Sequence, residues 1–155
     1  MVCLPNGAPL CAACPLQSLC AGYKAGTAPE LPVKAAKPKR KIERKTVFIL
    51  RCGEKTALNR RPESGLLAGL WEFPNVVGTL SPVRAEALLK KWGVGVTDMT
   101  PLPKAKHLFT HVEWQMTGYF VRSDTETEGF AWACRDEIAE RYTVPSAFKA
   151  YLSLL

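Results

Sequence analysis

The sequence predicts an α+β fold in which helices flank one mixed sheet, preceded by a short cysteine loop and a basic linker. Apolar β-branched runs and alternating runs recur through residues 46–155, together with helical start and stop residues. Residues 3–20 contain four of the six cysteines. Residues 23–45 are rich in Ala, Pro and Lys without periodicity, which is typical of a linker. We therefore divide the chain into residues 1–22, 23–45 and 46–155.

Strands are expected at four places, which are TVFIL (46–50), TALNRR (56–61), KAKHLFTHVEWQMTGYFVR (104–122) and GFAWA (129–133). A turn at Gly53 and Glu54 joins the first two as a hairpin. The third stretch alternates well enough to form one long bent strand or two shorter strands. The resulting order of elements predicts a mixed domain with one sheet.

The clearest helix is expected after Ser81, which is a typical N-cap, with Pro82 at the first helical position and Gly93 at the end. Its apolar residues are expected to share one face, formed by Val83, Ala87, Leu88 and Trp92. A short helix is expected from Arg135, and a last helix with an apolar C-terminus from Pro145.

The net charge of +7 is concentrated in one part of the chain. Residues 24–61 contain twelve Lys or Arg against three Glu, and the densest part is KPKRKIERK (37–45). This pattern fits a solvated linker, and it also fits a strip that follows a phosphate backbone. Both interpretations can hold together. The candidate contacts to such a phosphate backbone are Lys39, Arg40, Lys41, Arg44 and Lys45.

No stretch approaches the roughly 20 apolar residues of a membrane span, and the N-terminus lacks the charged start and apolar centre of a signal peptide. We expect a cytoplasmic monomer that does not bind a membrane. In a reducing cytosol, clustered cysteines are metal ligands more often than disulfides.

The clustered cysteines are spaced Cys3-x7-Cys11-x2-Cys14-x5-Cys20. Four thiolates in a short loop can surround an iron–sulfur cluster or a tetrahedral zinc ion. Zinc ribbons usually present two close pairs, whereas one pair is flanked here by two single cysteines, which favours a cluster. Zinc and the absence of any metal remain open. The isolated Cys52 and Cys134 are expected to be small buried hydrophobic residues.

The cysteine segment resembles the cluster loop that closes the helical domain of endonuclease III-type DNA glycosylases. That family usually has six residues in the first gap, whereas this chain has seven. Three further stretches resemble the C-terminal domain of MutY-type adenine DNA glycosylases: RRPESGLLAGLWEFPN (60–75), HLFTHVEWQMTGYFV (107–121) and YTVPSAF (142–148). The resemblance covers nearly the whole chain in the family's order, from cluster loop to linker to Nudix-like domain.

This resemblance implies a role in DNA repair. The family removes adenine that is mispaired with 8-oxoguanine in duplex DNA, and its Nudix-like domain reads the oxidised guanine. The lesion is touched by an FSH-type motif, which stands here as Phe109-Thr110-His111, where threonine keeps the hydroxyl of the usual serine. The resemblance also implies a 4Fe-4S cluster on the four cysteines, with zinc or no metal as the alternatives in this chain alone.

The resemblance further implies that the natural protein is longer, lies in the bacterial cytosol or nucleoid, and binds double-stranded DNA containing 8-oxoguanine opposite adenine. The catalytic Glu and Asp belong to the family's helical glycosylase domain, which we expect to precede this segment in the same natural chain. No catalytic residue is therefore assigned here, and we expect no glycosylase activity from this chain alone.

A stand-alone Nudix-type nucleotide hydrolase is the alternative, because GLWEFPN (69–75) also resembles the start of the Nudix box. That box, G-x5-E-x7-REUxEExGU, needs several glutamates on one helix to hold Mg²⁺. Between Pro74 and Gly95 the only acidic residue is Glu86, and it is followed by Lys90 and Lys91. Hydrolysis is therefore disfavoured. A zinc-stabilised domain that joins two proteins is a third, weaker alternative.

Overall fold

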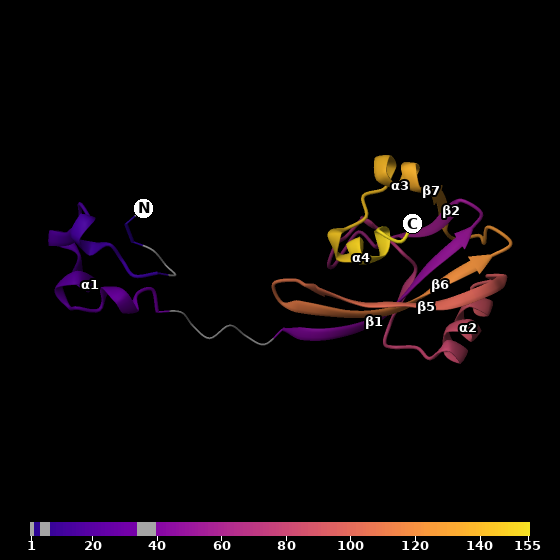
Figure 1. Ribbon diagram of the computed structural model, residues 1–155, viewed down its shortest axis with the longest axis horizontal. Coiled ribbons are helices and arrows are strands. Elements are labelled where there is room, and N and C mark those ends of the chain that lie inside the picture. Colours follow the sequence, from indigo (N-terminus) through magenta and orange to yellow (C-terminus); the bar gives the residue numbers. More distant parts are fainter. Residues whose placement is uncertain (1, 4–6, 34–39) are drawn as a thin grey trace. The chain divides into compact units, whose positions relative to one another are not determined.

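A computed structural model describes residues 2–3, 7–33 and 40–155 of the chain (Figure 1). The chain divides into two compact units, Met1–Pro38 and Lys39–Leu155. The first unit contains only short helical turns, at Cys11–Ala13, Gln17–Leu19, Ala21–Lys24 (α1) and Ala28–Glu30. None of its described residues is buried.

The second unit is built on a seven-stranded sheet, whose main path runs β3-β2-β1-β6-β5. Strand β4 pairs with β1, and β7 pairs with β2. The parallel pairing of β1 with β6 joins the middle of the sheet, and all the other pairs are antiparallel. The strands are β1 (Lys41–Cys52), β2 (Lys55–Arg60), β3 (Trp71–Glu72), β4 (Asn75–Val77), β5 (Val96–Leu108), β6 (Val112–Ser123) and β7 (Ala131–Cys134).

The predicted α+β class and all four predicted strand regions are confirmed. The 104–122 region forms parts of two strands, β5 and β6, joined by a turn at residues 109–111. The boundary at residue 45 needs correction, because β1 begins at Lys41 and residues 41–45 pair with Val112–Met116 of β6. The second half of the basic strip is therefore strand rather than linker.

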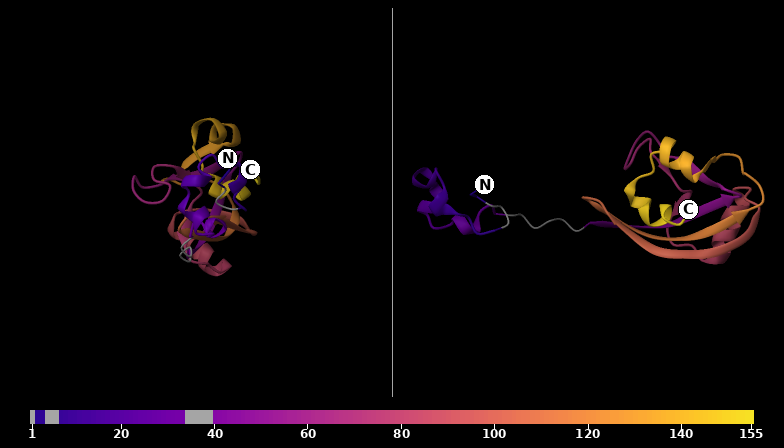
Figure 2. Two further views of the ribbon diagram at one scale, coloured as in Figure 1. Left: turned by 90° about the vertical axis from the view of Figure 1, so that its left-hand side faces the viewer. Right: turned by 45° about the horizontal axis from the view of Figure 1, so that its top comes forward.

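Two cores lie on the two faces of the sheet, because side chains alternate along β1. Val47 and Ile49 join one core with Trp114, Phe148 and Tyr151. Helices α3 (Arg135–Arg141) and α4 (Lys149–Leu152) lie on this side, together with the short turn Ser146–Phe148 (Figures 1 and 2). The helices and the sheet therefore enclose this first core between them.

The second core lies on the opposite face, where Phe48 and Leu50 pack with Ala85 and Leu89 of α2 (Pro82–Lys91). The predicted start and end of α2 are confirmed. Its predicted buried face is confirmed at Leu88 and Trp92, which are partly buried against this core, and is wrong at Val83 and Ala87. Ala85 and Leu89 are fully buried, whereas Val83 is 78% exposed and Ala87 is exposed. Successive helical residues turn by about 100°, so Val83 lies about 200° around the helix from Ala85. Ser81 makes no capping side-chain hydrogen bond.

None of the helices in the described parts of the chain is both long enough and apolar enough to cross a membrane.

Candidate nucleic-acid interface

The FSH-type motif forms the turn between the two longest strands of the sheet. Phe109 follows β5 directly, and its N–H donates to the carbonyl of Val112 at 2.8 Å. Thr110 and His111 are exposed, whereas Phe109 is partly buried. The phenyl ring of Phe109 lies edge-on to the indole of Trp114, with ring centres 4.9 Å apart. Phe109 therefore anchors the turn while its two polar neighbours face solvent.

The turn is tied to the start of β1, which carries the described part of the basic strip. Arg40 Nε donates to the carbonyl of Phe109 at 2.9 Å, and the Lys41 N–H donates to the carbonyl of His111 at 3.0 Å. The structure therefore brings together two groups of predicted site residues that are about 70 positions apart in the sequence. Arg40, Lys41 and Arg44 are exposed. Lys39 lies outside the described residues.

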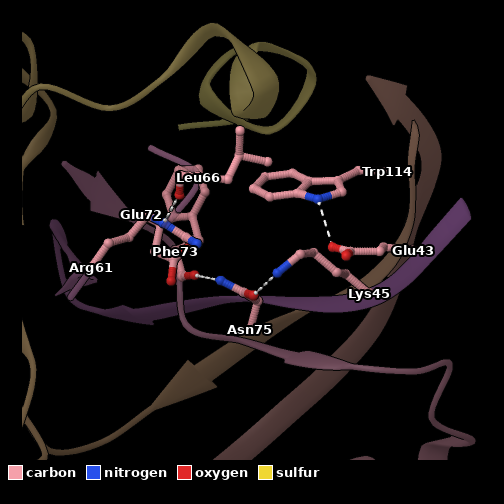
Figure 3. A network of polar contacts seen from close by, with 8 residues as sticks. All are labelled: Glu43, Lys45, Arg61, Leu66, Glu72, Phe73, Asn75 and Trp114. Atoms are coloured by element: carbon pink, nitrogen blue, oxygen red, sulfur yellow. Dashed lines mark hydrogen bonds and ion pairs between the residues drawn. The ribbon is translucent and has the colours of Figure 1, made fainter. Parts of the chain in front are cut away.

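Lys45 requires a correction, because it cannot contact a phosphate backbone in this fold. It is only 7% exposed, and its ammonium donates to Asn75 Oδ1 at 3.1 Å (Figure 3). The same ammonium lies 4.4 Å from the centre of the Trp114 ring, a distance typical of a cation–π contact. Burial lowers the pKa of Lys45, and the nearby Glu72 carboxylate opposes that change.

Trp114 connects this buried lysine to the turn. It is 1% exposed, and its indole N–H donates to Glu43 Oε2 at 3.2 Å (Figure 3). A hydrogen bond from Lys41 lowers the pKa of Glu43, which keeps the carboxylate ionised as an acceptor. The indole is thus held on its edge by Glu43 and on its face by Lys45. The resemblance at residues 107–121 included Trp114, but no sequence pattern indicated this supporting role.

A partly buried ion pair completes the network. The Arg61 guanidinium contacts the Glu72 carboxylate, and Arg61 Nε also donates to the carbonyl of Leu66 at 3.0 Å (Figure 3). Asn75 Nδ2 donates to the carbonyl of Phe73 at 2.8 Å. No buried side-chain polar atom of the described residues lacks a hydrogen-bond partner. The floor beneath the turn is therefore a satisfied polar network, which favours a single arrangement.

All four cysteines of the N-terminal unit line one small cavity, together with Tyr23, Gln17 and small apolar residues. No carboxylate or imidazole shares that lining. Within residues 2–3, 7–33 and 40–155, however, no three Cys, His, Asp or Glu side chains are grouped tightly enough to hold a metal ion. The donor type and the shared cavity suit a soft metal or cluster, and the thiols would have to move closer to bind it. Cys52 and Cys134 are only partly buried, so the expectation of full burial is not met.

The helix that would carry a Nudix box offers no magnesium site. Its Glu86 carboxylate is half-exposed and lies 3.0 Å from the ammonium of Lys90. The other glutamates of the box are missing from the sequence, so this helix carries a single carboxylate.

The chain is similar to two groups of known proteins, the adenine DNA glycosylases and the proteins with a NUDIX domain. The human adenine DNA glycosylase is 33% identical over 97 residues, which cover 55% of this chain and 18% of the human protein. The mouse adenine DNA glycosylase is 27% identical in an alignment that covers 88% of this chain and 37% of the mouse protein. This chain therefore spans well under half the length of these relatives.

The solved structure of the C-terminal domain of mouse MUTYH, in complex with human PCNA, superimposes with a TM-score of 0.56 at 25% identity. The match covers 72% of this chain and 88% of that domain. The chain is therefore similar to the C-terminal part of a MutY-type glycosylase. The family model described as NUDIX domain matches residues 46–154, so this chain belongs to the NUDIX domain family.

Proposed function

We propose that this chain is the C-terminal recognition part of an adenine DNA glycosylase that removes adenine mispaired with 8-oxoguanine. In this proposal the chain reads the strand that carries 8-oxoguanine, and the catalytic groups belong to a separate helical domain. The observation that carries the proposal is the exposed Thr110-His111 pair at the tip of the β5–β6 hairpin, held by a partly buried Phe109. The similarity to adenine DNA glycosylases supports the same conclusion.

The chemistry of the lesion suits these two side chains. 8-Oxoguanine differs from guanine by an oxygen at C8 and by N7, which becomes a hydrogen-bond donor instead of an acceptor. A threonine hydroxyl can accept from N7 or donate to O8, and a neutral imidazole can likewise do either. A well-placed contact to a base edge is typically worth ~1–3 kcal/mol of discrimination. The turn therefore supplies a local preference, while the whole enzyme closing on both bases supplies the rest.

The basic residues beside the turn supply affinity without sequence preference. The exposed side chains of Arg40, Lys41 and Arg44 are placed to approach phosphates, and such contacts weaken as salt rises. Because Arg40 and Lys41 are also hydrogen-bonded to the turn, a phosphate contact would fix the position of Thr110 against the duplex.

We also propose that Cys3, Cys11, Cys14 and Cys20 hold a 4Fe-4S cluster, with zinc as the alternative occupant in the isolated chain. The support is that all four thiols line one cavity and that no carboxylate or imidazole shares that lining. When bound, the cluster crosslinks the loop around it. The cysteines themselves would then act as structural ligands, holding residues 3–20 in one conformation.

The test of lesion reading is Thr110→Ala, compared with the unchanged chain on two duplexes that differ only in 8-oxoguanine or guanine opposite adenine. We expect the lesion preference to fall by about tenfold, the equivalent of ~1.4 kcal/mol, with little change on undamaged DNA. Equilibrium fluorescence anisotropy of labelled duplexes measures both affinities.

Thr100→Ala is the matched control, because Thr100 is an exposed threonine on β5 outside the turn. It should change neither affinity. If Thr110→Ala weakens binding to both duplexes equally, the hydroxyl is not the lesion contact. If the unchanged chain shows no lesion preference at all, this chain does not read 8-oxoguanine by itself, and the proposal is overturned in this form.

A further inference from the structure

The basic strip is divided between the two faces of the sheet because it forms a strand. Side chains of a strand point alternately to opposite faces. Lys41, Glu43 and Lys45 therefore face the side of Trp114. Glu43 and Lys45 contact the indole there (Figure 3), and Lys41 pairs with Glu43. Arg44 points to the other side. Contiguity in the sequence therefore does not make these residues one surface, and the partners of Arg44 must come from other strands.

Those partners come from the β5–β6 hairpin. Arg44 of β1 is in register with Gln115 of β6, which lies opposite Lys106 of β5. Residues in register across neighbouring strands present their side chains on the same face. Lys104 lies in the irregular register between Leu102 and Ala105, a place where a bulge redirects side chains. Arg44 therefore meets Lys104 and Lys106, two cations that are far from it in the sequence, on one face of the sheet.

These residues line a hollow of about 460 Å³, which we call the basic groove. Its polar lining comprises Arg44, Thr79, Lys104, Lys106, Glu113, Gln115 and Thr117. Helix α2 covers this face of the sheet only at the end away from the 109–111 turn (Figures 1 and 2). The groove therefore lies on the uncovered part of the sheet, on the same hairpin as the turn.

The charges of the basic groove are available for a ligand. No carboxylate in the described parts of the chain lies within ion-pair distance of Arg44, Lys104 or Lys106. One acidic residue, Glu113, lies in the lining, and its Oε1 accepts from Gln115 Nε2 at 3.0 Å. The three cations outnumber this single carboxylate. Hydroxyl, amide and cationic donors together are the groups that contact phosphates in nucleic-acid complexes.

We propose that the basic groove binds the phosphodiester backbone of the DNA duplex whose lesion the 109–111 turn reads. This inference rests on the proposed function, and it adds Lys104 and Lys106, two cations outside the basic strip, to the phosphate contacts. The neutral donors Thr79, Thr117 and Gln115 supply hydrogen bonds between the cations. No base edge is read there, so the groove adds affinity equally for damaged and undamaged DNA.

The test replaces the three groove cations together, as Arg44→Gln, Lys104→Gln and Lys106→Gln, in the full chain. Binding to a labelled undamaged duplex is measured by anisotropy across a salt series of about 50 to 200 mM. Each lost phosphate contact should reduce the slope of log K against log salt by about 0.9, so the triple variant should lose about 2 to 3. Affinity at the lowest salt should fall at least about tenfold.

The matched control makes the same change of net charge on the opposite side of the sheet, as Arg135→Gln, Arg141→Gln and Lys149→Gln. These three residues are exposed on α3 and α4. The control should keep the salt slope of the unchanged chain. Circular dichroism melting of both triple variants checks that each is folded, which is expected because all six side chains are exposed.

Equal losses in the two triple variants would show that only net charge matters, and they would overturn the groove. An unchanged salt slope in the groove variant would also overturn the proposal.

The ratio of the affinities for damaged and undamaged duplex tests the proposed function, whereas the salt slope tests the groove. If the unchanged chain shows no lesion preference, Thr110 does not read the lesion. The salt slope on undamaged DNA still tests the groove in that case. A groove variant that loses affinity but keeps the lesion preference of the unchanged chain supports the groove.

Discussion

The two units of this chain are stabilised in different ways. The sheet unit has fully buried residues on both faces, including Phe48, Leu50, Trp114 and Phe148. In the N-terminal unit, none of the described residues is buried, and Leu16 and Leu19 are 62% and 77% exposed. Burial of apolar surface is the main favourable term in folding, so the sheet unit has a source of stability that the N-terminal unit lacks. What the N-terminal unit has instead is four thiols around one cavity.

This difference teaches that the two units respond to different perturbations. A unit without a core needs a crosslink, a metal or a neighbouring domain to fix its conformation. A unit with a closed core needs none of these. Perturbing the metal ligands should therefore act on the first unit alone, and perturbing the core should act on the second alone.

The largest expected effect is the loss of bound metal from the N-terminal unit. After reconstitution with iron and sulfide, Cys14→Ser should abolish the visible absorbance of a cluster and make Lys24 readily cut by trypsin. Lys24 is the only Lys or Arg in residues 1–33, so cleavage there reports on this unit specifically. The four tryptophans all lie in the sheet unit, so their fluorescence in urea should show unchanged unfolding.

Cys52→Ser is the control, because Cys52 ends β1 and does not line the cysteine cavity. It should keep the absorbance and the protection of Lys24. If the protein contained zinc and no iron after reconstitution, the four cysteines would hold zinc and not an iron–sulfur cluster. Protection of Lys24 without any metal would contradict the idea that this unit depends on a ligand.

The next effect is expected from Trp114→Ala in the core of the sheet unit. Removing a buried tryptophan costs about 3–5 kcal/mol, and here it also removes one of the two aromatic contacts of Phe109, the other being with His107. The urea midpoint of the remaining tryptophan fluorescence should fall accordingly, while the rate of cleavage at Lys24 stays unchanged. Trp114→Phe keeps an aromatic ring and loses only the hydrogen bond to Glu43, so its loss should be clearly smaller. Equal losses in the two variants would mean that the ring does not support the turn.

Much of this comparison could be predicted from the sequence, and particular residues mark where prediction stopped. The strand at TVFIL and the helix start at Pro82 follow from local patterns, whereas the turn that carries the motif was expected only from the family resemblance. The burial of Ala85 in place of Val83 on α2 does not follow from the sequence, because both residues are apolar and only contact with the sheet selects Ala85. The basic groove could not be predicted from the sequence either, because Arg44 and Lys106 become neighbours only through strand register.

Lys45 shows the same limit, and the smallest predicted effect tests it. In the sequence it is one of several lysines in a basic strip, whereas in the structure it is the cation beneath Trp114. Replacing it as Lys45→Met removes the cost of burying a charge, and it also removes a donor to Asn75 and a cation–π contact. These changes oppose each other, so the free energy of unfolding at neutral pH should stay within about 1 kcal/mol of the unchanged chain. The salt slope of DNA binding should not change, because the side chain does not reach solvent.

The pH dependence gives the sharper result for Lys45. Burial lowers the pKa of Lys45 below its ordinary value of 10.5, so between the two values the unfolded chain binds more protons at this residue than the folded chain. The free energy of unfolding therefore gains a contribution that rises with pH through this window. Lys45→Met should lack that rise when urea midpoints are compared between neutral pH and pH 10.5. Lys41→Met, on the same strand but with a side chain that is 74% exposed, should retain it. If Lys45→Met instead keeps the rise and lowers the salt slope by about 0.9, Lys45 contacts phosphate, and the strip acts as a continuous surface after all.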